Sequence, residues 1–189
     1  MWPLLLVSII ALSVIIERIS FVLKISARRN QQIERDFLSA VSSGDSAKAL
    51  SIAKSTKDYV VKVLEKGVIE VAGSQALVHA ATAQLKRFAR GLTILDTAIT
   101  ISPLLGLLGT VTGMIHAFGL LGAAELSAPT VITGGIAEAL IATAFGLSIA
   151  IFSLLPFNYL TAQTEEARHE IEQAARRLEM ILEKKRSEG

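Results

Sequence analysis

The chain has 189 residues, of which 51% are hydrophobic and 19% charged, and its mean hydropathy is +0.52. This composition is too apolar for a soluble domain of this size and indicates a membrane protein. The sequence has no cysteine and three widely separated histidines, which excludes disulfides and thiolate chemistry and gives no metal-ligand spacing. No phosphate-binding glycine loop or hydrolase motif occurs, so we expect the protein not to be an enzyme.

Three long apolar segments predict transmembrane helices at residues 1–23, 97–122 and 131–160. In the first segment the charged pair at residues 17–18 is expected to reach the membrane interface by snorkelling. Basic residues follow the apolar run of this segment rather than preceding it, which favours an uncleaved anchor over a cleaved signal peptide. The third segment is longer than a bilayer is thick, so we expect it to project into water.

The distribution of basic residues predicts the orientation of these helices. Twelve Lys or Arg lie in residues 24–90 and six follow residue 160, whereas the loop at residues 123–130 contains none. Because basic residues gather on the cytoplasmic side of a membrane, the sequence predicts an outside N-terminus and a cytoplasmic C-terminus. Residues 24–96 and 161–189 are then cytoplasmic, and the loop at 123–130 lies on the outer side of the membrane.

The polar parts of the chain have helical periodicity throughout. A helix is predicted from about residue 30 to the Ser-Ser-Gly at 42–44, and a second one follows with Asp45 as its N-cap. Apolar residues recur at helical spacing from about 58 to 90, with a possible break at residues 73–74. The C-terminal segment is predicted to continue the third span as an amphipathic helix, with one apolar stripe formed by Ala167, Ile171, Ala174, Leu178 and Leu182. The expected fold is an all-α membrane protein with long helices extending into a cytoplasmic helical region.

Small and hydroxyl-bearing residues share one face on each of the last two predicted spans. On the second span this face consists of Pro103, Gly106, Thr110, Gly113 and Ala117, with Gly109 beside it. On the third span it consists of Gly135, Ala139, Thr143, Gly146, Ala150 and Ser153. Small residues allow close helix packing, which is the favoured interpretation for most of the glycines and alanines. The threonines are compatible either with packing or with the wall of a pore, because a threonine hydroxyl also bonds to its own helix.

Glu138 favours an ion pathway. A carboxylate inside a span is costly in lipid and usually faces water or protein, although one near the outer end could also snorkel to the surface. Three spans cannot enclose a pore, so a pore would require an oligomer that brings several copies of Glu138 together. Asp96 and His116 are further titratable candidates, for which an interfacial anchor is the favoured interpretation.

The stretches "WPLLLVSIIALSVIIERI", "ISPLLGLLGTVTGMIHAF" and "ITGGIAEALIATAFGLSIAI" resemble the MotA/TolQ/ExbB proton-channel family, most closely its ExbB and TolQ members. The resemblance implies a multi-pass protein of the bacterial inner membrane that forms a homo-oligomeric ring, a pentamer. It also implies that the ring surrounds a single-span ExbD/TolR-like partner and energises a TonB/TolA-like protein for outer-membrane transport. Protons are then the transported species, and neither a cofactor nor a nucleic acid is expected.

The resemblance also assigns roles to residues. It implies that Thr110 and Thr143 are pore-facing hydroxyls, that Glu138 is the charged residue of the third span and that Pro103 is the family's proline. Thr112 departs from the pattern, because the family commonly has tryptophan there. The alternative hypothesis is a structural membrane scaffold that conducts no ions.

Overall fold

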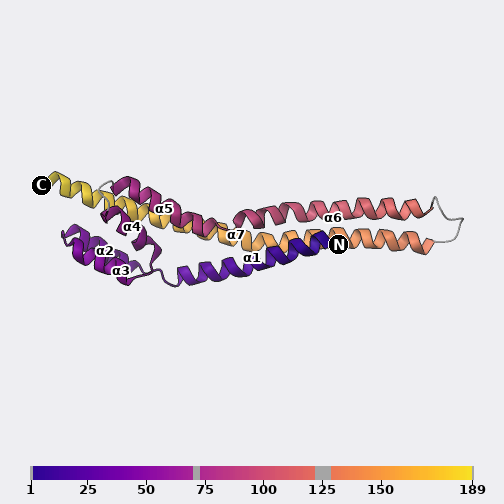
Figure 1. Cartoon of the computed structure of the whole chain (residues 1–189), viewed down its shortest axis with the longest axis horizontal. Coiled ribbons are helices and arrows are strands. Elements are labelled where there is room, and N and C mark those ends of the chain that lie inside the picture. The colour runs from indigo at the N-terminus through magenta and orange to yellow at the C-terminus, as the bar shows by residue number, and fades with distance from the viewer. Residues whose placement is uncertain (1, 70–72, 122–128, 189) are drawn as a thin grey trace. The chain divides into compact units, whose positions relative to one another are not determined.

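The computed structural model describes residues 2–69, 73–121 and 129–188, and every regular element within them is an α-helix (Figure 1). The helices are α1 (Trp2–Ser26), α2 (Gln31–Ser42), α3 (Ser46–Ser55), α4 (Tyr59–Ile69), α5 (Gly73–Ala89), α6 (Leu92–Leu121) and α7 (Pro129–Glu188). The chain divides into two compact units. The first unit comprises Met1–Arg18 and Gly91–Tyr159, and the second comprises Ile19–Arg90 and Leu160–Gly189.

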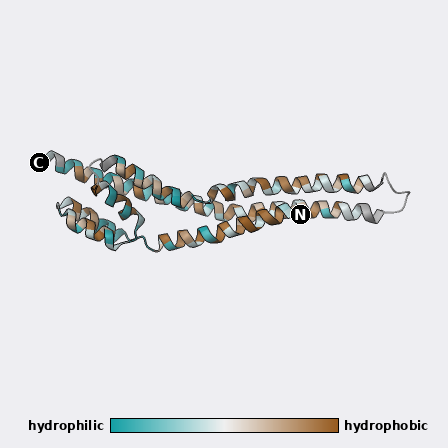
Figure 2. Ribbon diagram, viewed as in Figure 1, coloured by the Kyte–Doolittle hydropathy of each residue, from teal (hydrophilic) through white to brown (hydrophobic). Residues whose placement is uncertain are grey.

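Three helical segments are long and apolar enough to cross a membrane. They are Trp2–Ser26, Gln75–Gly119 and Thr133–Lys185, and Figure 2 shows the hydrophobic residues along them. The prediction of an all-α fold is therefore confirmed, and the structure contains three candidates for the predicted membrane-spanning helices. The predicted periplasmic loop at 123–130 lies mostly outside the described residues.

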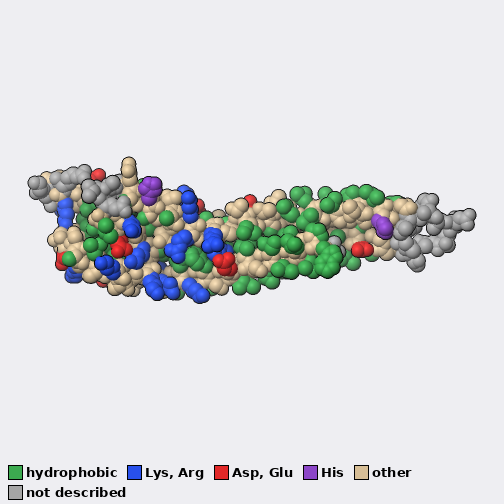
Figure 3. Space-filling model, in the orientation of Figure 1, with side chains coloured by type: hydrophobic (Ala, Val, Ile, Leu, Met, Phe, Trp, Pro, Cys, Tyr) green, Lys and Arg blue, Asp and Glu red, His purple; other side chains and the backbone are tan. Residues whose placement is uncertain are grey.

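The first unit exposes many large apolar side chains. Leu104 of α6 is 59% exposed, and Phe152 of α7 is 74% exposed. Figure 3 shows hydrophobic side chains gathered over the first unit and charged ones over the second. An apolar surface of this extent is typical of a protein face that contacts lipid or further protein.

The second unit has a core of its own, to which α2, α4 and the C-terminal part of α7 contribute. Phe37, Val60 and Leu64 are fully buried. The buried stripe of α7 consists of Ala167, Ile171, Ala174 and Leu178. Four members of the predicted amphipathic stripe are thus buried, whereas the fifth, Leu182, is 37% exposed. The next inward position belongs to Ile181, which packs against the core three residues after Leu178.

Local signals explain where several of these helices begin and end. The side chain of Asp45 accepts a hydrogen bond from the Lys48 N–H at 2.9 Å and caps α3, as the sequence predicts. Gly44 has a φ of 86°, a left-handed conformation that suits glycine and separates α2 from α3. Gly91, with a φ of 84°, separates α5 from α6 in the same way. The possible break at residues 73–74 adjoins residues 70–72, which lie outside the described part of the chain.

Candidate functional site

Helices α6 and α7 approach closely along their small residues. A Cβ placed on Gly113 would lie 2.8 Å from the Cβ of Ala139, and one placed on Gly135 would lie 2.9 Å from the Cβ of Ala117. These separations are well below ordinary van der Waals contact, so only glycine permits the helices to lie this close. We call this contact the seam, and it comprises Gly106, Gly109, Gly113 and Ala117 of α6 with Gly135, Ala139, Ala142 and Gly146 of α7.

The two backbones lie closest around Gly106 and Gly146. A Cβ on Gly106 would lie 3.0 Å from the Cα of Thr143, and one on Gly146 would collide with the carbonyl oxygen of Ser102. At the same level the Thr143 hydroxyl donates a hydrogen bond of 2.9 Å to the carbonyl oxygen of Gly106. The missing side chain of Gly106 therefore gives Thr143 access to the backbone of α6, and the two helices are joined by a polar bond as well as by packing.

Thr110 lies beside the seam and is partly exposed. Its hydroxyl donates to the carbonyl oxygen of Leu107 in its own helix, at 2.6 Å. Thr112 behaves similarly, since its hydroxyl donates to the carbonyl of Leu108 at 2.9 Å. The hydroxyl protons of Thr110 and Thr143 are thus both committed within the chain, while each oxygen keeps lone pairs with which it can accept another bond.

Glu138 lies outside the seam. It precedes Ala139 by one residue, which places it about 100° around α7 from that seam residue. Its side chain is exposed, and the exposed apolar Ile141 lies one turn further along the same side of α7. No hydrogen bond or ion pair engages its carboxylate within the part of the chain that the structure describes. The structure therefore brings Thr143 and Gly106 together and leaves Glu138 facing outward.

The remaining candidates lie on or near the surface of α6. Asp96 and His116 are exposed, and Pro103 is partly exposed inside the continuous helix. The carbonyl of Asp96 accepts a hydrogen bond of 3.0 Å from the Thr100 hydroxyl, but its carboxylate has no partner among the described residues. Roles for these residues in proton transfer stay predictions.

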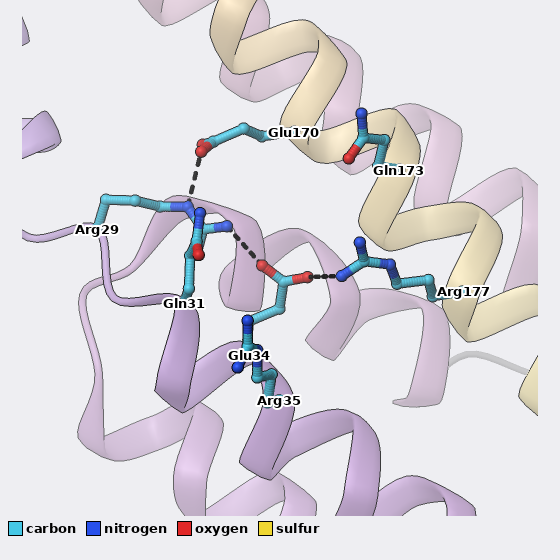
Figure 4. Close-up of a pocket in the computed structure, with 7 residues that line it drawn as sticks. All are labelled: Arg29, Gln31, Glu34, Arg35, Glu170, Gln173 and Arg177. Carbon is cyan, nitrogen blue, oxygen red and sulfur yellow. Dashed lines mark hydrogen bonds and ion pairs between the residues drawn. The ribbon is translucent and has the colours of Figure 1, made fainter.

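A buried charge cluster in the second unit was not predicted from the sequence. The Arg29 guanidinium donates hydrogen bonds of 3.0 Å to both Asp58 and Glu170 and a further bond to Glu34. Figure 4 shows Arg29 with Glu34 and Glu170, and Arg177 reaching the other oxygen of Glu34 at 3.4 Å. Asp58 is fully buried. Its carboxylate also caps α4 by accepting the Val60 N–H at 2.8 Å, so the cluster connects the segment between α1 and α2 to α2, α4 and α7.

The cluster changes the proton affinities of two of its members. Burial by itself would lower the pKa of Arg29, but the hydrogen bond with Glu34 and the charge of Asp58 outweigh it, so that the pKa is raised. Burial raises the pKa of Tyr59, and the hydrogen bond that its hydroxyl donates to Glu170 raises it further. Both groups therefore keep their protons at physiological pH.

A small polar cavity of about 190 Å³ adjoins this cluster (Figure 4). Its acidic members, Glu34 and Glu170, are bonded to arginine. No group of three His, Asp or Glu side chains suited to a metal ion occurs among the described residues. The cluster is a structural element of the second unit.

Comparison with known proteins gives the family. Residues 30–173 match the MotA/TolQ/ExbB proton channel family. The ExbB-like 1 protein of Synechocystis is 36% identical over 171 residues, which cover 86% of this chain and 66% of that protein. The biopolymer transport protein ExbB of Neisseria gonorrhoeae is 33% identical over 115 residues, or 61% of this chain and 50% of that protein. The Tol-Pal system protein TolQ of Haemophilus influenzae is 46% identical over 67 residues, covering 35% and 29% of the two chains.

This chain thus spans between about a third and two thirds of the length of these relatives. The family is one of membrane transport proteins rather than of enzymes, and the three apolar helices agree with it. The match covers most of the chain, including the whole of α6 and residues 129–173 of α7. The chain belongs to the MotA/TolQ/ExbB proton channel family.

Proposed function

We propose that this protein is an ExbB/TolQ-like subunit of a proton-driven motor in the bacterial inner membrane. One observation carries the proposal: Glu138 is an exposed carboxylate on a membrane-spanning helix of a proton channel family, with no partner among the described residues. Such a group is costly in lipid, so it is expected to face water or another protein chain.

The basic residues support an orientation with the N-terminus outside. Twelve Lys or Arg lie between residues 24 and 90 and six follow residue 160. In this orientation Glu138, near the start of α7, lies towards the outer surface. A ring of these carboxylates would hold a negative potential at the entrance and favour the entry of cations.

A homo-oligomer, for which the family resemblance favours a pentamer, would complete the pore. The exposed apolar side chains of α6 and α7 give each copy a surface that neighbouring copies and lipid can cover. An ExbD/TolR-like partner helix would occupy the centre and carry a carboxyl group that gains and loses a proton. Movement of that partner would energise a TonB/TolA-like protein that acts at the outer membrane.

The threonine geometry suggests which state of the partner the pore favours. Because the hydroxyl protons of Thr110 and Thr143 are committed to backbone carbonyls, each oxygen is left as an acceptor. An acceptor binds a protonated carboxyl group and not a carboxylate, so these threonines would stabilise the neutral form of the partner and raise its pKa. Release of the proton would follow when the partner leaves this environment.

The test is proton flux into proteoliposomes that contain the protein together with its ExbD/TolR-like partner. We expect Thr110→Val and Glu138→Gln to abolish partner-dependent flux while the complex still assembles. Thr112→Val is the matched control, since it makes the same substitution on the same helix and removes a similar bond within the helix. Normal flux in both Thr110→Val and Glu138→Gln would refute the proposal and favour the structural scaffold.

A further inference from the structure

A basic pocket lies in the second unit, apart from the seam and from the Arg29 cluster. It encloses about 530 Å³ and is lined by five basic side chains, Arg28, Lys57, Lys62, Lys66 and Arg87. Glu65 is the one carboxylate among the described residues that line it, and it is paired with Lys62 at 3.1 Å. Five positive charges against one negative charge leave a net charge of four positive around a single cavity.

Three of the five basic side chains are not paired with acids in the part of the chain that the structure describes. Within the described residues no carboxylate forms an ion pair with Arg28, Lys57 or Lys66. The Arg87 guanidinium is held in place by the ring of Phe21, 6.0 Å from the ring centroid, and by a 3.2 Å hydrogen bond to Gln84. Like charges gathered in one cavity repel one another, so an anion that enters it gains from several of them at once.

Apolar side chains form part of the remaining lining. Val63 is buried, and Ile25 and Ala80 are partly buried. A ligand that suits this lining carries a compact negative charge together with a hydrocarbon part. The cavity volume falls within the range of about 300–1,000 Å³ that is usual for small-molecule sites.

The position of the pocket along the chain narrows the chemistry further. Arg28 lies two residues after the end of α1, and Arg87 lies in the last turn of α5, shortly before the apolar run of α6. Arg28 thus lies just beyond the first candidate span, and Arg87 lies within the second one, ahead of its apolar part. Basic side chains at such positions are expected near phospholipid headgroups. Arginine and lysine are the residues that bind phosphate, arginine through two parallel hydrogen bonds and lysine as a point charge.

We propose that the basic pocket binds a phosphate anion, presented as the headgroup of an anionic phospholipid in the adjacent leaflet. The apolar side chains Ile25, Val63 and Ala80 would contact the glycerol and the first methylene groups of the lipid. This inference does not depend on proton conduction, because it uses none of the residues of the seam and neither Glu138 nor Thr110.

Native mass spectrometry of the delipidated full-length protein tests the proposal. The protein is titrated with dioleoyl phosphatidylglycerol, with dioleoyl phosphatidylcholine as the neutral lipid of equal chain length, and with glycerol 3-phosphate as the soluble phosphate. The variant is Lys57→Gln/Lys66→Gln, and the control is Lys48→Gln/Lys54→Gln, which removes the same charge from exposed positions outside the pocket.

We expect phosphatidylglycerol to bind more tightly than phosphatidylcholine. The pocket variant, which loses two basic residues, should weaken the binding of phosphatidylglycerol about 30-fold, given the usual contribution of each basic residue near a membrane surface. The control should change the binding constant less than threefold. If glycerol 3-phosphate binds as tightly as phosphatidylglycerol, the pocket is a phosphate site, but the proposed lipid headgroup is wrong and a soluble phosphate compound is its ligand.

Equal losses in the two double variants would overturn the proposal, because they would indicate a general effect of surface charge. Equal binding of the two lipids would overturn it as well, and an acidic protein segment would then be the better candidate for this pocket. All four lysines are substantially exposed, and circular dichroism of each variant checks that the helices are retained.

Discussion

The close approach of α6 and α7 leads to a prediction about Gly146. In Gly146→Ala the new methyl group would collide with the carbonyl oxygen of Ser102 and crowd the Cα of Gly106, which would lie 3.2 Å away. Both contacts are with backbone atoms, which cannot turn away as a flexible side chain can. The two helices must therefore separate, and this also stretches the bond from Thr143 to Gly106.

The magnitude follows from two opposing effects. Overpacking in a well-packed contact costs about 1–3 kcal/mol, while replacing glycine by alanine within a helix gains about 0.5–1 kcal/mol. Gly134→Ala is the matched control on the same helix, because a Cβ there meets nothing within 4 Å. We expect Gly134→Ala to be neutral or slightly stabilising. Relative to Gly134→Ala, which shares the helical gain, Gly146→Ala should lower the free energy of unfolding by about 1–3 kcal/mol.

Unfolding by SDS in mixed detergent micelles, followed by the helical circular dichroism signal, measures this difference. Gel filtration of both variants must give the wild-type elution volume, so that a change in assembly is not mistaken for a change in folding. Equal free energies of unfolding for Gly134→Ala and Gly146→Ala would refute the packing argument, because they would mean that the helices separate at no cost at their closest point.

Three further predictions concern single side chains. Arg29→Gln leaves the fully buried Asp58 without its cation and should lower the free energy of unfolding by about 3–5 kcal/mol in denaturant titrations. Arg35→Gln on the exposed face of α2 should change it by less than about 0.5 kcal/mol. Because the pKa of Tyr59 is raised, above about pH 10 the unfolded chain loses a phenolic proton that the folded protein keeps. The free energy of unfolding should therefore fall as pH rises through this range. Tyr59→Phe should remove this contribution to the pH dependence of the melting temperature. Thr143→Val should lower the free energy of SDS unfolding by only about 0.6 kcal/mol, a value typical of a hydrogen bond between membrane helices, and Thr143→Ser should restore it. A loss several times larger in Thr143→Val would mean that the packing of this side chain, and not its hydrogen bond, dominates its contribution.

Helix positions could be predicted from the sequence because their signals are local. The Asp45 cap and the stripe from Ala167 to Leu178 depend on neighbours within a few turns, and the structure contains both. The left-handed conformation of Gly91, which directly precedes α6, was not predicted, because a single glycine between two helical patterns gives no periodic signal.

Contacts between distant parts of the chain could not be predicted. Arg29 and Glu170 are 141 residues apart, and nothing in either local sequence marks them as partners. The threonine pattern identified Thr143 as a residue of interest but left its hydrogen-bond acceptor open. A hydroxyl in a helix can bond to its own carbonyls or to a neighbouring helix, and only the absence of a side chain at Gly106 decides for the neighbour here.

The seam also indicates which parts of the first unit are free to change during transport. Glycine contacts along its length and the bond from Thr143 to Gly106 join α6 and α7 so closely that any relative shift must break several contacts at once. Packed contacts of this kind are stable in discrete arrangements and do not deform continuously. We therefore expect α6 and α7 to move as one body, and the changes that accompany proton transfer to occur at exposed positions such as Glu138 and Thr110. Substitutions in the seam should then lower stability before they affect flux, and substitutions at Glu138 or Thr110 should affect flux without lowering stability.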